Sequence, residues 1–220
     1  MSLKIMFLDE LKGFYRSRVM LALWVGMPLL ALLIHTFQPK LQGGMTLTLF
    51  ATFVVSSISG TLASIMLSVG IIHEKSRGVY SLFLVRPVKK NSILFGKFLA
   101  VFSCIVVAGI ITILISLLYD HLKGNPINQA LLREAGKSLL TGFSTMAISS
   151  AAGVLIGTLA PSVLVGVILV LYGGNQLSVL GLLPTMLKLP YPWVFSLGFG
   201  VVVTTVLLFL AAFLFNRKQF

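Results

Sequence analysis

Long apolar runs separated by short charged stretches dominate the hydropathy pattern of this 220-residue chain. A bilayer core about 30 Å thick is crossed by a helix of about 20 apolar residues. Six runs reach that length, and the pattern predicts six spanning helices, at 19–37, 45–72, 98–118, 138–160, 163–183 and 193–215. We therefore expect an all-α membrane protein in which residues 1–220 form a single transmembrane domain.

The first 18 residues have a different pattern. Leu3, Phe7, Leu11 and Phe14 recur at helical spacing, and charged residues fill many of the positions between them. Such a pattern is typical of an amphipathic helix in the membrane interface, so we predict one at 1–18. A cleaved signal peptide is the alternative, but the charged leader is long and no A-x-A cleavage pattern follows the apolar run.

The distribution of charge adds a prediction of how the spans are oriented across the membrane. The chain has 17 Lys and Arg residues against 5 Asp and Glu residues. In a soluble protein such an excess suggests nucleic acid, but hydrophobic residues make up 57% of this chain and charged residues 10%. Between apolar runs, Lys and Arg mark cytoplasmic segments instead. The N-terminus, the segment 73–97 and the C-terminal tail carry 12 of the 17, so we place both termini and this segment in the cytoplasm, and expect the lipid bilayer but no nucleic acid as a partner.

The segment 73–97, between the second and third spans, is the most polar internal stretch. Val79, Leu82 and Phe83 follow one another at helical spacing, and Pro87 prevents simple continuation of that helix. Two interpretations follow. The segment is a short cytoplasmic coupling helix that receives a soluble partner, or it is a basic loop that only fixes topology and binds anionic lipid.

A motif in this segment resembles the signature of the type-2 ATP-binding-cassette (ABC) exporter permeases. The matching positions are Glu74, Lys75, Arg77, Gly78, Leu82, Leu84, Pro87, Val88, Ile93, Leu94, Gly96 and Lys97, with no gap. The layout of an interfacial helix followed by six spans is similar to that family as well.

The resemblance implies a permease subunit that dimerises, with a homodimer favoured over a heterodimer, above two ABC ATPase subunits. ATP and Mg would be bound by those partners, with no cofactor on this chain, which has no G-x-x-x-x-G-K-[ST] sequence. The implied protein is a transport subunit and not an enzyme, in the plasma (inner) membrane of a prokaryote, exporting a small or hydrophobic substrate. We expect the ATPase-coupling contacts at Glu74, Arg77, Gly78, Val79, Leu82, Phe83 and Pro87.

Small and polar residues inside the spans are candidates for a substrate path or for close helix packing. The second span is rich in Ser and Gly, and Asn175 and Gln176 follow a glycine pair in the fifth. We predict path lining at Ser64, Ser68, Asn175 and Gln176, and helix packing at Gly60, Gly153 and Gly157. Packing alone could also explain the serines, and a kink at the glycine pair could explain the two amides. The proline-broken stretch 184–192 is either a re-entrant outer segment or an ordinary loop.

Other chemistry finds little support in the sequence. No Asp, Glu, Lys or Arg lies in the middle of a span, which disfavours an ion-coupled secondary transporter. Cys104 is the only cysteine, and His35, His121 and Asp120 lack a metal-ligand spacing, so we predict neither a metal site nor catalytic residues. The competing functions are a small channel or facilitator without an ATPase, and an intramembrane enzyme acting on lipid.

Overall fold

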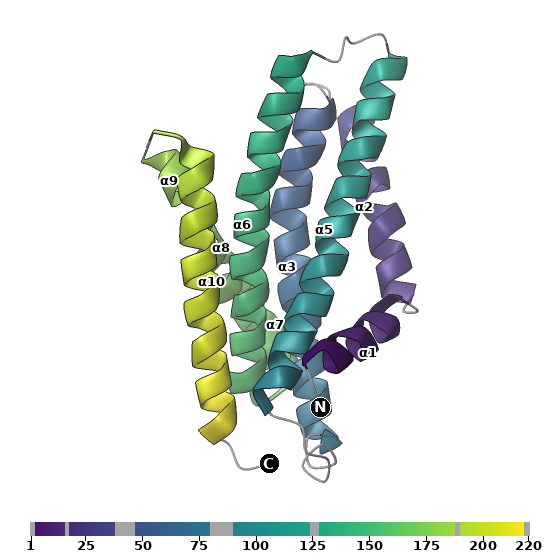
Figure 1. Cartoon of the computed structure of the whole chain (residues 1–220). Coiled ribbons are helices and arrows are strands. Elements are labelled where there is room, and N and C mark those ends of the chain that lie inside the picture. Colours follow the sequence, from purple (N-terminus) through teal and green to yellow (C-terminus); the bar gives the residue numbers. More distant parts are fainter. Residues whose placement is uncertain are drawn as a thin grey trace.

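The computed structural model describes residues 3–15, 18–37, 47–79, 90–123, 128–187 and 190–217. Every regular element in these ranges is a helix (Figure 1). The α-helices are α1 (Leu3–Tyr15), α2 (Arg18–Phe37), α3 (Leu47–Ser76), α5 (Lys90–Leu122), α6 (Gln129–Leu159), α7 (Val163–Leu169), α8 (Asn175–Val179), α9 (Leu183–Met186) and α10 (Pro192–Arg217). A π-helical turn, η2 (Val170–Gly174), and a 3-10 turn, η3 (Leu180–Leu182), join α7, α8 and α9.

Five stretches within the described residues are long and apolar enough to cross a membrane. They are Phe50–Ser76, Asn91–Leu122, Gln129–Leu159, Val163–Met186 and Pro192–Arg217. The predicted class, an all-helical membrane protein with several spans, is confirmed. The predicted first span corresponds to α2, whose apolar part, Leu23–Leu33, is shorter than the other five. A sixth span at α2 therefore stays a prediction.

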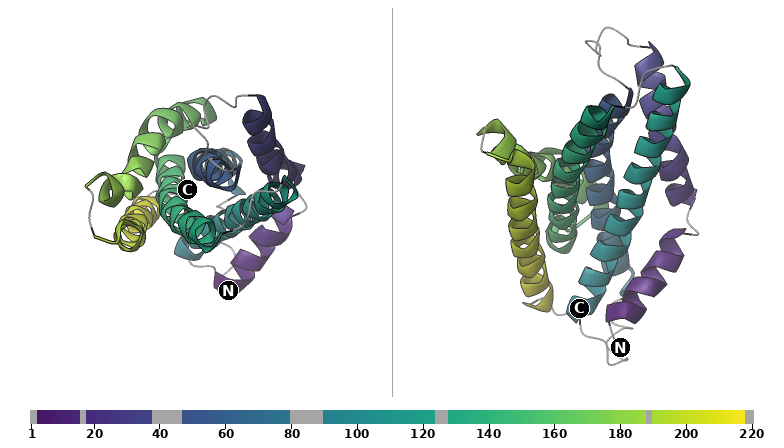
Figure 2. Two further views of the ribbon diagram at one scale, coloured as in Figure 1. Left: turned by 90° about the horizontal axis from the view of Figure 1, so that it is seen from above. Right: turned by 45° about the horizontal axis from the view of Figure 1, so that its top comes forward.

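The helices pack side by side around α3. Helices α2, α5, α6 and α7 all contact α3, and α10 packs against the outer side of α6 (Figure 2). Helix α1 crosses the first turns of α5 at an angle to the bundle (Figure 1). The beginning of α5 and the end of α10 lie at the same end of the bundle as α1, so the described portions of the three basic segments lie together there (Figure 1).

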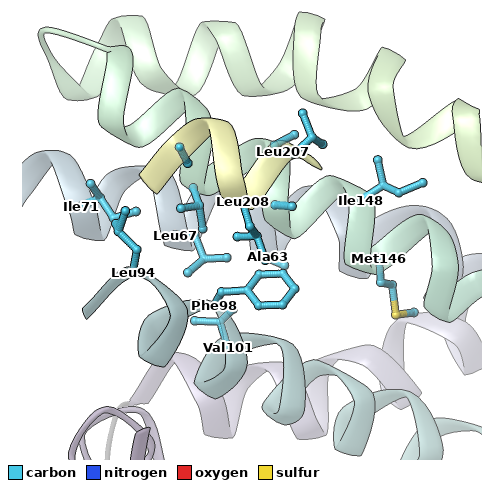
Figure 3. Close-up of a cluster of buried hydrophobic side chains, with 14 of the residues drawn as sticks. Ala63, Leu67, Ile71, Leu94, Phe98, Val101, Met146, Ile148, Leu207 and Leu208 are labelled. Carbon is cyan, nitrogen blue, oxygen red and sulfur yellow. The ribbon is translucent and has the colours of Figure 1, made fainter. Parts of the chain in front are cut away.

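The largest buried cluster lies between α3, α5, α6 and α10. Figure 3 shows Leu67 of α3, Phe98 of α5 and Leu208 of α10 gathered in this cluster, with Met146 and Ile148 contributed by α6. Lipid tails are as apolar as these side chains, so close van der Waals packing, and not escape from water, stabilises such a cluster in a membrane.

Small residues allow α3 and α6 to approach closely. A Cβ added at Gly153 would lie 2.5 Å from the Ser64 Cα, and one at Gly157 would lie 3.0 Å from the Ser68 Cα. Gly60 faces Ser149, whose hydroxyl donates to the Gly60 carbonyl oxygen at 2.8 Å. The three glycines named from the sequence for helix packing therefore all lie on this one contact, which we call the α3–α6 seam.

Two helices extend well beyond their apolar runs. Helix α5 has 33 residues and α6 has 31, which at 1.5 Å per residue gives about 50 Å and 46 Å. The polar stretch before the fourth predicted span is helical from Gln129, because its Ala, Leu, Arg and Glu residues favour helix. A hydropathy run predicts only the part of a helix that lies in the bilayer core. The helix itself is longer, because its backbone hydrogen bonds continue into the polar residues on either side.

The fifth predicted span is a broken helix that curves around α6. Its first part, α7, contacts α3, the middle elements contact α6, and α9 contacts α10 (Figure 2). The π-helical turn contains Gly173 and Gly174, so the chain bends there without ending its helical course. Of the stretch 184–192, Pro184 is buried in α9 and 188–189 lie outside the described residues.

Asp120 fastens the start of α3 to the end of α5. Its carboxylate accepts hydrogen bonds from the Leu47 and Thr48 amides at 3.2 and 2.9 Å, and from the Thr48 hydroxyl at 2.7 Å. A helix N-terminus has unpaired N–H groups and a partial positive charge, so a carboxylate there is favourable. The only acid among the three residues considered for a metal thus caps a helix.

Candidate functional site

The polar segment begins where α3 ends. The Arg77 amide donates to the His73 carbonyl oxygen at 3.1 Å, and the Gly78 amide donates to that of Lys75 at 3.3 Å. Gly78 has a φ of 66°, a conformation that residues with a Cβ adopt at a cost. Gly78 therefore terminates α3 and redirects the chain. Of the predicted coupling residues, Leu82, Phe83 and Pro87 lie outside the described residues.

Lys97 is the centre of a buried ion cluster at this end of the bundle. Its Nζ lies 2.6 Å from Glu10 Oε1 of α1 and 2.5 Å from Glu74 Oε1 of α3. Lys97 is only 5% exposed, whereas about a quarter of each glutamate side chain is exposed. One lysine thus ties α1, α3 and α5 together through charge-assisted hydrogen bonds, which are stronger than neutral ones. We call these three residues the Lys97 cluster.

Gly96 explains how α1 comes close enough to reach Lys97. A Cβ at Gly96 would lie 3.3 Å from the Met6 Cβ and 3.5 Å from the Phe7 backbone nitrogen. Helix α1 therefore crosses α5 directly over Gly96. The two adjacent motif residues have complementary roles, since Gly96 admits α1 and Lys97 binds its Glu10.

The residues around Glu74 extend the connection to α6. Lys75 Nζ lies 3.4 Å from the carbonyl oxygen of Ala160, the residue that caps the C-terminus of α6. A cation there interacts favourably with the negative end of the helix dipole. Arg77 is exposed and Val79 is half-buried. The end of α3 is therefore joined to three helices, while its last turn faces outward.

A second polar region is a pocket of about 230 Å³ between α3, α6 and the α8–η3 region, which we call the polar pocket. Its lining residues are Ser56, Ser57, Gly60, Thr61, Ser138, Thr141, Gly142, Thr145, Asn175, Ser178, Val179 and Leu182. Several hydroxyls, such as those of Ser56 and Thr145, donate to carbonyl oxygens of their own helices at 2.7 and 2.8 Å. Their oxygen lone pairs are left to accept hydrogen bonds. The lining has many hydroxyls and one amide but no ionisable side chain.

The structure separates the residues named from the sequence for path lining. Asn175 borders the polar pocket, and Gln176 is exposed on α8 without bordering it. Ser64 and Ser68 are fully buried in the α3–α6 seam, against Gly153 and Gly157. In this chain the two serines therefore take part in helix contact, and hydroxyls nearer the start of α3 line the pocket.

The structure gives three residues contacts that the sequence did not predict, Lys97 and Glu10 in the Lys97 cluster and Thr141 in the lining of the polar pocket. The sequence marks Lys97 as a motif position and a topology signal but not as an ion-pair partner, includes Glu10 only among the charged positions of the N-terminal helix, and does not single out Thr141. The Gly96–Lys97 pair of the motif was a local signal that Lys97 has a specific position in the fold. Nothing local predicts the contacts of Glu10 or the place of Thr141 in the pocket lining, because both depend on helices distant in sequence.

A family model described as ABC-2 family transporter protein matches residues 10–176. That range is about three quarters of the chain and includes the whole Lys97 cluster. The chain belongs to the ABC-2 transporter family. No curated protein matches it. Membership makes this chain the membrane component of a transporter, which is not itself catalytic, and it implies association with ABC ATPase subunits.

In the ranges that the structure describes, no group of three or more His, Cys, Asp or Glu side chains is placed to hold a metal. The polar features present are an ion cluster at the basic end of the bundle and an uncharged pocket between the helices. The first joins α1, α3 and α5, and the second is lined by hydroxyls and one amide.

Proposed function

We propose that this chain is the permease subunit of an ABC exporter, driven by two separate ATPase subunits that dock on the segment 73–97. The Lys97 cluster carries this proposal, because it joins the root of that segment to α1 and α5. The ATPases would hold ATP and Mg. In this proposal the basic end of the bundle faces the cytoplasm, because Lys and Arg mark cytoplasmic segments.

Helix α3 is the element that transmits movement. It runs without a break from Thr48 to Glu74, and Thr61 of the polar pocket lies 13 residues, or about 20 Å, from Glu74 along it. A force on the segment after Gly78 acts first on Glu74 and then on the helices held by the Lys97 cluster. Rigid movement of α3 against α6 then changes the polar pocket, which lies between them.

A second copy of the chain completes the path, and a homodimer is the simplest assembly. Helix α2 presents exposed apolar residues every fourth position, at Leu21, Val25, Leu29 and Leu33. The α7–η2 surface presents Leu164, Ile168, Leu171 and Tyr172. Helices α2 and α7 lie on either side of α3 (Figure 2), so a partner copy covering both apolar surfaces would enclose the exposed side of α3 and the polar pocket. The substrate we propose is small, uncharged and apolar or weakly polar.

The test is to co-express the chain with its candidate ATPase, purify the complex in nanodiscs and measure the subunit ratio and the ATP turnover. Phe83→Asp places a charge among the apolar residues of the coupling helix predicted from the sequence, and we expect it to release the ATPase. Leu132→Asp is the matched control, because Leu132 is an exposed apolar residue at the opposite end of the bundle. It should keep the ATPase bound.

Two results would overturn the proposal. A Phe83→Asp variant that keeps its ATPase and full turnover would show that the segment is not the docking element. A wild-type chain that carries no ATPase at all would favour the channel or facilitator, in which the basic segment serves only topology and lipid.

A further inference from the structure

A second cavity lies on a different side of α6 from the polar pocket. It is a groove of about 380 Å³ between α5, α6 and α10, which we call the aromatic groove. Phe95, Phe98, Phe102 and Phe143 line it together with residues of α10, and none of its lining residues borders the polar pocket. Its volume is within the range of about 300–1,000 Å³ typical of small-molecule sites.

One residue of the groove lining, Thr204, has a hydroxyl without a hydrogen-bond partner among the described residues. Thr204 is 8% exposed, and its Oγ1 is buried without a hydrogen-bond partner among the residues that the structure describes. Two neighbouring hydroxyls are satisfied: Ser144 donates to the Ser196 carbonyl oxygen at 2.7 Å, and Thr205 donates to that of Val201 at 2.8 Å. A buried hydroxyl without a partner is unfavourable, and a bound molecule with one hydrogen-bonding group would relieve that cost.

The aromatic rings favour a flat occupant. The Phe98 and Phe102 rings are stacked, with centroids 5.7 Å apart and planes within 5° of parallel. Aromatic side chains bind other flat aromatic groups by offset stacking and by edge-to-face contact. The lining has no ionisable side chain, so it would reject a charged molecule. The groove lies along spanning helices, and a hydrophobic molecule would enter it from the bilayer.

We propose that the aromatic groove binds an uncharged, flat aromatic molecule that makes one hydrogen bond to the Thr204 hydroxyl. This site is separate from the polar pocket and does not depend on the exporter assignment, because it is complete within one chain. Its four phenylalanines recognise the aromatic body, and Thr204 distinguishes a ligand with a polar group from a pure hydrocarbon.

The experiment measures binding of 6-fluoro-2-naphthol to the whole 220-residue chain in nanodiscs by fluorine NMR, with 2-fluoronaphthalene as the probe that lacks a hydroxyl. Empty nanodiscs correct for partition into lipid. We expect Thr204→Val to weaken binding of the naphthol about three- to tenfold, the value of one hydrogen bond, and to leave binding of the fluoronaphthalene unchanged. Thr205→Val is the matched control and should leave both unchanged, because the Thr205 hydroxyl is bonded within its own helix.

A second variant tests the volume of the groove. Ala147 lines it and is half-buried, so Ala147→Phe should fill it and abolish saturable binding of both probes. The proposal is overturned if protein-containing and empty nanodiscs give the same signal, which would mean that lipid chains alone occupy the groove. It is equally overturned if Thr204→Val binds the naphthol as tightly as wild type, and this second test does not depend on the folding of Ala147→Phe.

Discussion

Lys97 is a buried cation whose two carboxylate partners come from positions 87 and 23 residues away in the sequence. Removing water from a lysine is costly, and the two glutamates with their charge-assisted hydrogen bonds offset that cost. The Glu74 Oε2 atom is buried and has no hydrogen-bond partner among the described residues. Lys97 is the only positively charged member of the cluster, so the stability of both partly buried carboxylates depends on it.

Replacement of Lys97 by methionine, which has a similar length, tests this dependence. Lys97→Met leaves Glu10 and Glu74 close together without their cation. We expect a loss of about 3 kcal/mol in the free energy of unfolding, near the lower end for a broken buried pair because both glutamates are partly exposed. Unfolding by SDS in mixed micelles provides the measurement.

A neutral version of the cluster is the control for that substitution. The triple variant Lys97→Met, Glu10→Gln, Glu74→Gln contains no unpaired charge, so it should recover more than half of the loss. If the single and triple variants are equally unstable, packing around Lys97, and not its charge, holds the three helices together.

At the scale of elements, the α3–α6 seam depends on glycines that have no room for a side chain. Gly153→Ala would place its Cβ 2.5 Å from the backbone of Ser64, so the two helices must separate. We expect a loss of about 1–3 kcal/mol in SDS unfolding, typical of overpacking. Gly136→Ala in the same helix has open space around it and should gain up to about 1 kcal/mol through helix propensity. Equal effects of the two variants would contradict this account of the seam.

Asp120 caps the N-terminal end of α3, opposite the Lys97 cluster. Asp120→Ala removes the acceptor of three hydrogen bonds, and we expect a loss of about 1–2 kcal/mol, as for other helix caps. Asp120→Asn keeps one side-chain oxygen and should lose less than half of that. Hydrogen exchange of the Leu47 and Thr48 amides should accelerate in the alanine variant. Unchanged exchange at both amides would show that the cap is not needed there.

The sequence predicted the apolar parts of the helices better than their polar extensions and their breaks. The apolar runs placed the second, fifth and sixth spans within about five residues and the ends of the third and fourth as closely, because each spanning helix needs an apolar length set by the bilayer. The helical extensions before Phe98 and Ser138 were not predicted, since polar helix outside the bilayer has no hydropathy signal. The sequence did not decide whether the fifth span is broken, because a glycine pair allows a bend without determining it.

At the scale of the whole molecule, polar residues of similar type lie in two different surroundings. Asn175 borders the polar pocket, whereas Ser64 is buried in the α3–α6 seam. In a Cys104→Ala background, Asn175→Cys should therefore react with a water-soluble thiol reagent, and Ser64→Cys should react at least ten times more slowly. The reaction rate depends on access of water and on formation of the thiolate. Fast labelling of Ser64→Cys would place the path along the seam instead.

The sequence by itself determined the class of this protein, the approximate spans and the resemblance that the ABC-2 family match confirms. These are properties of neighbouring residues, in which apolar length, charge bias and a contiguous motif are all visible locally. Only the tertiary structure decided that Lys97 binds Glu10 and Glu74, that Ser64 packs on Gly153, and which hydroxyls line the polar pocket. Such pairings depend on how each helix is rotated and where it crosses its neighbours, and many residues of the chain act on that packing at once.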